Sequence, residues 1–326
     1  MRSTASGSCR GAAPRGDDPV KILVTGGAGF IGSHVVDAYA AAGHDVAVVD
    51  TLRTGREAYV HPQARLYRVD VASPELADVF ARERPEVVNH HAAQASVAVS
   101  VKEPLEDARV NALGTLNILN QAVRTGVRKV IFASTGGALY GEPEGMPVRE
   151  DHPVRPLSPY GASKYAGEIY VNLYGRLHGL SFFILRYANV YGPRQDPYGE
   201  AGVVAIFTAA MLGGRTPVIF GAGTQTRDFV YVEDVARANL LATAHVGDGV
   251  VHVSTGIETT VNDIYRLLAE ATGEGGAPEY GPPREGDVYR IALDPALAAR
   301  TLAWRPRVGL EEGLRRTVEW FRVSAP

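Results

Sequence analysis

A tyrosine and a lysine four residues apart, Tyr160 and Lys164, are the side chains of this sequence best suited to acid–base chemistry. They lie in the segment SPYGASKYAGEIYVNLY, in which Ser158 can cap a helix, a proline fits the first turn and apolar residues recur at helical spacing. Residues four apart share one face of a helix. A phenol becomes a useful base when nearby positive charge lowers its pKa of about 10 by about three, which takes roughly 4 kcal/mol of phenolate stabilisation.

Two hydroxyl side chains, Ser134 and Thr135, end the apolar run RKVIFAST about 25 residues before Tyr160. That run is typical of a buried strand, and open α/β sheets bind their ligands at the carboxyl ends of their strands. One of the two hydroxyls could therefore hold a substrate hydroxyl while Tyr160 takes its proton. The residues by themselves leave open which of the two does so.

Three glycines, Gly26, Gly29 and Gly32, follow directly after the apolar run KILVT. The first can take the unusual dihedral angles of a sharp turn, the second lets backbone amides approach a pyrophosphate, and the third lets helix and strand pack closely. A helix that begins here points its unpaired N–H groups at the phosphates. Because the glycines lie between a strand and a helix, they indicate a dinucleotide site more than a purely structural turn.

The choice of dinucleotide depends on Asp50, which ends the next apolar run 18 residues after Gly32. A carboxylate there can accept hydrogen bonds from both ribose hydroxyls and would repel a 2′-phosphate. Asp50 therefore favours NAD over NADP. Arg53 follows three residues later, and its positive charge leaves NADP open.

Two further strand ends are expected to line the cofactor. Asp70 and Val71 could contact the adenine, although Asp70 could also be a helix-capping turn residue. Mostly small side chains follow the next run, at His91, Ala92, Ala93 and Gln94. His90 and His91 are neighbours in a strand and point to opposite faces, and no carboxylate cluster follows them, so we expect no metal site.

The elements that must position these residues alternate between strand-length apolar runs and helical patterns from residue 20 onward. This alternation predicts an α/β fold, a doubly wound parallel sheet of the Rossmann type with a smaller C-terminal α/β lobe. The expected strands are residues 21–25, 45–50, 64–70, 86–91, 128–135 and 181–190. We expect a flexible tail at 1–19, a dinucleotide-binding domain at 20–187 to which 229–258 returns, and a substrate-binding lobe at 188–228 and 259–326.

The composition excludes several classes of protein. The 326 residues carry a net charge of -3, with both signs interspersed, which disfavours a nucleic-acid-binding protein. The single cysteine, Cys9, allows no intrachain disulfide and no multi-cysteine metal site, and it suits a reducing cytoplasm. No stretch approaches 18 uninterrupted apolar residues and the first twenty lack an apolar run, so we expect neither a membrane span nor a signal peptide.

Several long motifs make the chain similar to the extended short-chain dehydrogenase/reductase superfamily, and within it to the NAD-dependent epimerase/dehydratase family. They are TGGAGFIG, DTLRTG, HHAAQASV, ASTGGALYGE, SPYGASK, RYANVYGPRQDPYGEAGVV, IFGAGTQTRDFVYVEDVA and PPREGD, within residues 21 to about 322. They most resemble the bacterial UDP-glucose 4-epimerases. The resemblance implies bound NAD and a UDP-hexose substrate, which is oxidised at C4, turned over as the 4-keto sugar and reduced on its opposite face.

The resemblance also implies roles for single residues. Asn111 and Tyr187 would contact the nicotinamide end of NAD, and Lys164 would anchor its ribose and tune Tyr160. Further cofactor contacts would come from Phe30, Ile31, Thr51, Leu52, Arg53, Thr54 and Gly55. Substrate contacts would come from Thr135, Tyr160, Asn189, Val204, Val218, Phe220, Arg227, Arg284 and Asp287. Two arginines suit a diphosphate, an aromatic ring suits uracil, and a carboxylate suits the uridine ribose.

The chain departs from the family pattern in two places. Relatives often carry Ser-Ser-Ala before a YG pair, whereas this chain has the longer stretch Ser134-Thr135-Gly136-Gly137, and we expect Thr135 to be the working hydroxyl. Ala188 stands where relatives often have Phe, so one cofactor contact is expected to be missing.

Three alternatives to a UDP-glucose 4-epimerase remain. A 4-epimerase of UDP-glucuronate or of a UDP-N-acetylhexosamine needs only altered contacts to the sugar. A 4,6-dehydratase or decarboxylase shares the oxidation step, but dehydratases usually carry Asp-Glu where this chain has Gly136-Gly137. A non-catalytic NAD-binding scaffold would usually have lost the Tyr or the Lys of YxxxK, and this chain has both. Members of the superfamily commonly pair helices such as those expected near 103–125 and 160–178 across a dimer, which predicts a homodimer.

Overall fold

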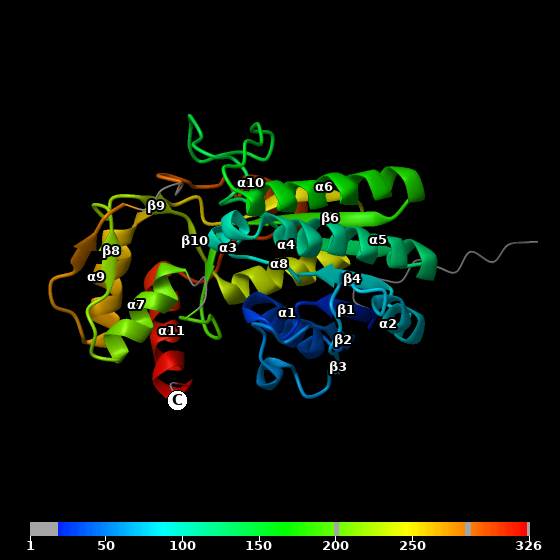
Figure 1. Ribbon diagram of the computed structural model, residues 1–326, viewed down its shortest axis with the longest axis horizontal. Coiled ribbons are helices and arrows are strands. Elements are labelled where there is room, and N and C mark those ends of the chain that lie inside the picture. Colours follow the sequence, from blue (N-terminus) through cyan, green and yellow to red (C-terminus); the bar gives the residue numbers. More distant parts are fainter. Residues whose placement is uncertain (1–18, 199–201, 284–287, 325–326) are drawn as a thin grey trace, which may run out of the picture.

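The computed structural model describes residues 19–198, 202–283 and 288–324 and contains a parallel sheet of seven strands (Figure 1). In spatial order the strands are β11 (Gly249–Val253), β6 (Ser181–Tyr187), β5 (Lys129–Thr135), β4 (Val87–His90), β1 (Lys21–Thr25), β2 (Asp45–Val49) and β3 (Arg65–Tyr67). The order reverses direction between β1 and β4, as in a doubly wound sheet. The predicted fold class is confirmed.

Helices cover both faces of this sheet because its strands are apolar on both faces. Alternate residues of β1 enter different cores: Ile22 and Val24 pack in one apolar cluster and Leu23 in another. The first face is covered by α1 (Phe30–Ala41), α8 (Val232–Ala244) and α10 (Ala296–Leu302). The second is covered by α2 (Leu76–Glu83), α5 (Gly114–Thr125) and α6 (Pro159–His178).

Two predicted strands are shorter than expected by three residues or more. The strand predicted at 64–70 ends at Tyr67, because Asp70 uses its carboxylate to accept a hydrogen bond from the Ala72 N–H and so closes a turn. The strand predicted at 181–190 is interrupted at Ala188. There the chain leaves the large sheet, and β7 (Asn189–Tyr191) pairs with β10 (Phe229–Tyr231) instead.

A third apolar cluster lies between α7 (Val203–Leu212), α9 (Val261–Thr272) and α11 (Leu310–Ser324). Figure 1 shows these helices gathered at one end of the molecule, beside β8. The short strands nearby pair as β8 (Val218–Phe220) with β13 (Glu279–Gly281), and as β9 (Thr226–Arg227) with β12 (Thr259–Thr260). This group of elements packs around its own core, separate from the two cores of the sheet.

Three short helical segments lie before β5 in the chain, one of them just before β3 and two between β4 and β5. They are the 3-10 turn η1 (Glu57–Tyr59) and the helices α3 (Val97–Lys102) and α4 (Pro104–Ala108). A π-helical turn, η2 (Arg109–Leu113), joins α4 to α5 without a break. Among the described helices none is both long and apolar enough to cross a bilayer.

Candidate active site

The helix predicted around Tyr160 and Lys164 is α6, and it begins as the sequence indicates. The Ser158 hydroxyl accepts a hydrogen bond from the Gly161 N–H at 3.2 Å, and Pro159 occupies the first turn. Glycine at 161 lets this helix approach the preceding loop closely, since a Cβ there would lie 2.4 Å from the Ala138 carbonyl oxygen. Both functional side chains are thereby held against the end of β5.

Tyr160 meets the second of the two strand-end hydroxyls. The Thr135 side chain lies beside the phenol. Burial raises the pKa of Tyr160 to about 12, the interaction with Thr135 acts against this rise, and the nearby Asp107 carboxylate adds to it. In the described chain the phenol therefore has a pKa above its ordinary value, so a phenolate here needs further positive charge beside the ring.

Ser134 points elsewhere, because consecutive residues of a strand face opposite sides. Its hydroxyl donates to Glu168 Oε1 at 2.5 Å. Glu168 also forms a buried ion pair of 2.6 Å with Arg186 of β6. This arrangement commits Ser134 to an internal network and leaves Thr135 as the hydroxyl beside Tyr160.

Lys164 is buried, and its ammonium lies 4.4 Å from the centre of the Phe132 ring. Burial lowers the pKa of Lys164 to about 8, and the carboxylates of Glu168 and Asp107 act in the opposite direction. The lysine thus stays cationic at neutral pH through a balance between desolvation and two nearby negative charges.

The glycine turn fits a dinucleotide. Gly26 has a φ of +70°, and a Cβ there would lie 2.6 Å from the Ala92 amide nitrogen. A Cβ on Gly32 would lie 2.1 Å from the Gly26 carbonyl oxygen, so the turn and the helix are packed backbone to backbone. No side chain caps the start of α1 at Gly29, which leaves its first N–H groups available to phosphate oxygens.

Asp50 supports this turn directly. Its Oδ2 accepts from the Ala28 N–H at 3.0 Å and its Oδ1 from the Leu52 N–H at 2.8 Å. Each carboxylate oxygen can accept a second hydrogen bond, so the group can still bind a ribose hydroxyl. Leu52 itself has a φ of +58°, which bends the loop 50–55 back over Asp50.

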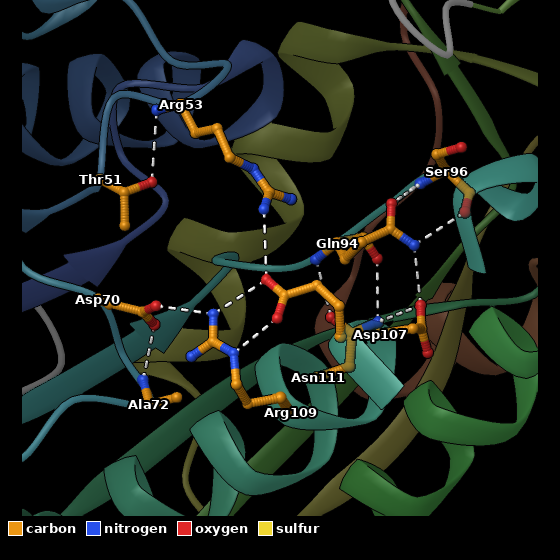
Figure 2. A network of polar contacts seen from close by, with 10 residues as sticks. Thr51, Arg53, Asp70, Ala72, Gln94, Ser96, Asp107, Arg109 and Asn111 are labelled. Carbon is orange, nitrogen blue, oxygen red and sulfur yellow. Dashed lines mark hydrogen bonds and ion pairs between the residues drawn. The ribbon is translucent and has the colours of Figure 1, made fainter. Parts of the chain in front are cut away.

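A chain of ion pairs joins that loop to the end of β3 (Figure 2). Arg53 pairs with Glu106 at 3.3 Å, Glu106 with Arg109 at 2.7 Å, and Arg109 with Asp70 at 2.9 Å. Glu106 and Arg109 are absent from the predicted site, because nothing in their local sequence indicates partners 39 and 53 residues away. Their pairing engages both Arg53 and Asp70, two predicted cofactor residues.

A second network lies to the right in the same view (Figure 2) and surrounds Asn111. The Asn111 amide nitrogen donates to Gln94 O at 2.9 Å, to Ser163 Oγ at 3.0 Å and to Asp107 Oδ1 at 3.1 Å. Its carbonyl oxygen accepts from the Gln94 N–H at 2.9 Å. All these partners are protein groups, so Asn111 holds the segment after β4 against α6. Asn111 lies in the π-helical turn, a feature often found at functional sites.

His91 and Tyr187 lie together, although β5 separates the strands β4 and β6 at whose ends they stand. Their rings stack at 5.9 Å, and His91 Nε2 lies 3.0 Å from the Tyr187 hydroxyl. Burial lowers the pKa of His91 to about 3, so the ring is neutral. His90 faces the other side of the sheet and contacts Thr25 and Thr115. Among the described residues no three metal-ligating side chains gather into a group.

The remaining predicted cofactor residues lie in the loops at the same edge of the sheet or at the start of α1. Thr51 Oγ1 accepts from the Arg53 N–H at 3.3 Å, and Val71 is buried against Gly114. Position 55 is tight for any side chain, since a Cβ on Gly55 would lie 3.0 Å from Asp50 Oδ1. The others in these loops or at the helix start are Phe30, Ile31, Thr54, Ala92 and Ala93.

The predicted substrate residues fall into different environments. Phe220 and Val218 are partly exposed on β8, and Arg227 Nη1 donates to the Thr226 carbonyl at 2.8 Å. Asn189 lies at the start of β7 beside Gly137, whose Cβ, if it had one, would lie 3.5 Å from Asn189 Oδ1. Val204 is fully buried in the third apolar cluster. Arg284 and Asp287 lie outside the described residues.

One buried carboxylate, next to Arg227 in the chain, was missed in the sequence. Asp228 accepts hydrogen bonds from the N–H groups of Thr255, Gly256 and Leu293 and from the Thr255 hydroxyl. It fastens the segments after β9 and β11 to one another. The motif TRDFVYV contains it, but no pattern in the sequence indicates its distant partners.

Comparison with known proteins agrees with this geometry. The model of the NAD dependent epimerase/dehydratase family matches residues 22–254. A UDP-glucose 4-epimerase of Mycolicibacterium smegmatis is 46% identical over 309 residues, which cover 93% of this chain and 99% of that protein. The UDP-glucose 4-epimerase of Thermotoga maritima, solved with UDP-glucose, is 51% identical with a TM-score of 0.92 and covers 94% of this chain and 100% of that one.

A second solved structure, the UDP-glucose 4-epimerase of Thermus thermophilus in complex with NAD, is 48% identical with a TM-score of 0.89. It covers 94% of this chain, and this chain covers 100% of it. These similarities confirm the predicted resemblance, and the family model alone spans more than half of the sequence. The chain therefore belongs to the NAD dependent epimerase/dehydratase family.

Proposed function

We propose that this protein is a UDP-glucose 4-epimerase that uses bound NAD to interconvert UDP-glucose and UDP-galactose. The observation that carries the proposal is the position of the Thr135 side chain beside the Tyr160 phenol at the carboxyl end of β5. It is the arrangement a general base needs in order to receive a proton from a sugar hydroxyl held by a second hydroxyl. Relatives that bear this name match nearly the whole chain.

NAD is the expected dinucleotide because the positive charge that could attract a 2′-phosphate is already paired. Arg53 contacts Glu106, and Asp50 adds a negative charge on the ribose side. A bound NAD supplies a hydride acceptor and donor for C4 of the sugar, and its cationic ring supplies positive charge near Tyr160. The glycine turn and the free N–H groups of α1 would hold the pyrophosphate.

In the proposed reaction Tyr160 acts as a phenolate, which the cationic Lys164 stabilises. Thr135 orients the 4-hydroxyl of the hexose, and the phenolate takes the proton of that hydroxyl and becomes the neutral phenol. When the 4-keto sugar is reduced on its opposite face, Tyr160 returns the proton to the new C4 hydroxyl. No net oxidation results, and the configuration at C4 is inverted.

For the 4-keto sugar to turn over, the protein must bind the nucleotide tightly and the hexose weakly. Phe220 and Arg227, at β8 and β9, are the proposed contacts to uracil and to the diphosphate among the described residues. In this proposal the lobe formed by 188–228 and 259–326 holds the nucleotide, and the domain formed by 20–187 with 229–258 holds NAD. Asn189 lies where the two parts of the chain meet.

Dehydration at C5 and C6 is the weaker candidate because the chain has Gly136 and Gly137 where it would need two acidic residues, and the first of these positions is crowded. A Cβ on Gly136 would lie 2.2 Å from Leu293 Cδ1, so an acidic side chain there would displace buried Leu293. The natural substrate is identified by incubating the protein separately with UDP-glucose, UDP-N-acetylglucosamine and UDP-glucuronate and following the products by NMR. Release of a 4-keto product would assign the protein to the dehydratases instead.

The direct test of the proposed base is Tyr160→Phe, assayed with UDP-galactose. We expect kcat to fall by about 10²- to 10⁴-fold, the usual contribution of a positioned base. Tyr165→Phe removes a hydroxyl from the same helix and serves as the matched control with wild-type activity. Equal activity of Tyr160→Phe and wild type would remove Tyr160 from the mechanism.

The proposed assembly is a homodimer, and the proposed location is the cytoplasm, which suits a chain whose single cysteine is Cys9. Large apolar side chains are exposed along one side of the helices that follow β4 and β5. They are Val97, Val101, Leu105, Leu113, Val123, Ile169, Leu173 and Leu177. Figure 1 shows α5 and α6 running side by side, and a second copy of this pair would cover the apolar side chains as a four-helix bundle.

A further inference from the structure

The carboxylate of Asp107 is buried between the segment after β4 and helix α6. The residue is 1% exposed and lies in α4, just before the π-helical turn. Its Oδ1 accepts hydrogen bonds from Gln94 Nε2 at 2.9 Å and from Asn111 Nδ2 at 3.1 Å (Figure 2). Its Oδ2 is equally buried and accepts no hydrogen bond from the described residues. A carboxylate removed from water in this way needs a compensating positive charge nearby.

Asp107 acts on Lys164, which lies in α6, the helix against which α4 packs. Its charge favours the ammonium of Lys164 against the larger, opposing effect of burial. Glu168 favours this ammonium more than Asp107 does, but Glu168 is already paired with Arg186 and accepts a hydrogen bond from the Ser134 hydroxyl. Asp107 accepts its two amide hydrogen bonds on Oδ1, and its Oδ2 has no hydrogen-bond partner among the described residues.

The other titratable groups around Lys164 supply no negative charge that would favour its ammonium. His90 and His91, from the end of β4, are neutral because burial and the lysine lower their pKa values. Tyr160 is neutral too, since burial and Asp107 raise its pKa. Arg109 in the π-helical turn is paired with Glu106 and Asp70, and Lys102 of α3 is exposed.

We propose that Asp107 is a positioning residue of the reaction. One oxygen fixes Asn111 and Gln94, and with them the segment after β4, while the negative charge of the carboxylate acts on the ammonium of Lys164 in α6, the helix against which α4 packs. The catalytic role of Asp107 rests on the proposed function. Its electrostatic effect on Lys164 is a property of the protein alone and can be measured without cofactor or substrate.

The same negative charge acts on both members of the acid–base pair. It favours charged Lys164 and disfavours the phenolate of Tyr160. Replacing it by the neutral, isosteric amide in Asp107→Asn would therefore lower both pKa values. An enzyme that needs Tyr160 deprotonated and Lys164 protonated would show both limbs of its pH–rate profile displaced towards lower pH.

The first experiment measures Lys164 directly, without ligands. The sequence contains four lysines, Lys21, Lys102, Lys129 and Lys164, so a protein labelled with ¹³Cε-lysine gives few NMR signals, and Lys164→Met assigns the one of interest. We expect Asp107→Asn to lower the titration midpoint of Lys164 by about 0.5 or more. The midpoint of Lys129, at the far end of β5, should not move.

Glu103→Gln is the matched control, because it removes an exposed carboxylate four residues away on the same helical segment. It should leave both the Lys164 midpoint and the pH–rate profile where they are in the wild type. Asp107→Glu keeps the charge and should restore the Lys164 midpoint even where its longer side chain lowers kcat. A purely structural role of Asp107 would reduce activity at every pH and displace neither limb.

An unchanged Lys164 midpoint in folded Asp107→Asn overturns the proposal. If that variant does not fold, Asp107→Ser removes the same charge with a smaller side chain and is judged by the same midpoint. A lowered midpoint together with no epimerase activity in the wild type would refute the proposed function and leave the electrostatic inference intact.

Discussion

The Ser134 hydroxyl donates a 2.5 Å hydrogen bond to Glu168, whereas its neighbour Thr135 contacts Tyr160. Two adjacent hydroxyls with the same chemistry thus have different partners. The Ser134 hydroxyl contacts the buried ion pair of Glu168 and Arg186, and the Thr135 hydroxyl makes the proposed catalytic contact. Their separate surroundings make their substitutions separable in experiments.

Thr135→Val should lower kcat for UDP-galactose by about 10²-fold, because the substrate hydroxyl loses the group that orients it, while thermal stability changes little. Ser134→Ala should show the reverse pattern. It leaves Glu168 with one buried partner fewer, which costs about 1–3 kcal/mol of unfolding free energy, and most of kcat remains. Urea unfolding and steady-state assays on both variants check this prediction, and similar losses of kcat in both would contradict it.

Stability should fall in mild acid because several histidines are buried in the neutral form. Burial lowers the pKa of His34 to about 4 and those of His91 and His252 to about 3. Below pH 6.5 the unfolded chain binds protons that the folded chain does not, so the free energy of unfolding decreases as the pH falls. Each such group contributes up to about 1.4 kcal/mol per pH unit.

This pH dependence is measured by urea unfolding between pH 7 and pH 5. His91→Phe keeps an aromatic ring against Tyr187 but removes one titrating group, and its stability should depend less steeply on pH than that of the wild type. His178→Asn alters an exposed histidine at the end of α6 and is the control. Equal slopes for His91→Phe and the wild type would refute the assignment.

Gly32→Ala should weaken NAD binding by at least about tenfold, because a Cβ 2.1 Å from the Gly26 carbonyl oxygen forces the turn away from the start of α1. Isothermal titration calorimetry with NAD measures the effect. Gly309→Ala adds the same methyl group where no atom lies within 4 Å, and it should bind NAD like the wild type. Wild-type affinity in Gly32→Ala would show that the turn does not hold the cofactor.

The proposed dimer predicts a change of mass. Ile169 and Leu177 lie on α6 and are 51% and 64% exposed. Replacing both by Glu should give a monomer by light scattering, since two charges per subunit would have to be buried in the interface. Val246→Glu, at an exposed position in the loop between α8 and β11, should leave the mass of the wild type. A wild-type mass in the double variant would place the interface elsewhere.

The parts of the fold and site that the sequence predicted depend on local patterns. The turn at Gly26, the capped helix that carries Tyr160 and the strand ends at Asp50 and Thr135 are each determined by residues close in the chain. Alternation along a strand also indicates that Ser134 and Thr135 diverge. It cannot tell which of them faces Glu168 and which faces Tyr160, because that depends on how α6 packs on the strand.

The parts that were missed depend on partners far apart in the sequence. Asp228, Glu106 and Arg109 act through residues 27 to 65 positions away, and charged residues in a helix give no sign of such partners. Val204 was predicted to contact substrate and is fully buried in a core, because an apolar residue in an apolar helix looks the same in either role.

The π-helical turn at Arg109–Leu113 holds one residue more than a regular turn, and α4, this turn and α5 form one continuous helical run. Were the same residues wound as an ordinary α-helix, everything before this turn would be rotated by about 100° about the helix axis relative to α5. Asp107 would then leave its place beside α6 although no chemical group had been altered. The wider turn absorbs the surplus residue and so keeps Asp107 and Asn111 in register with α6.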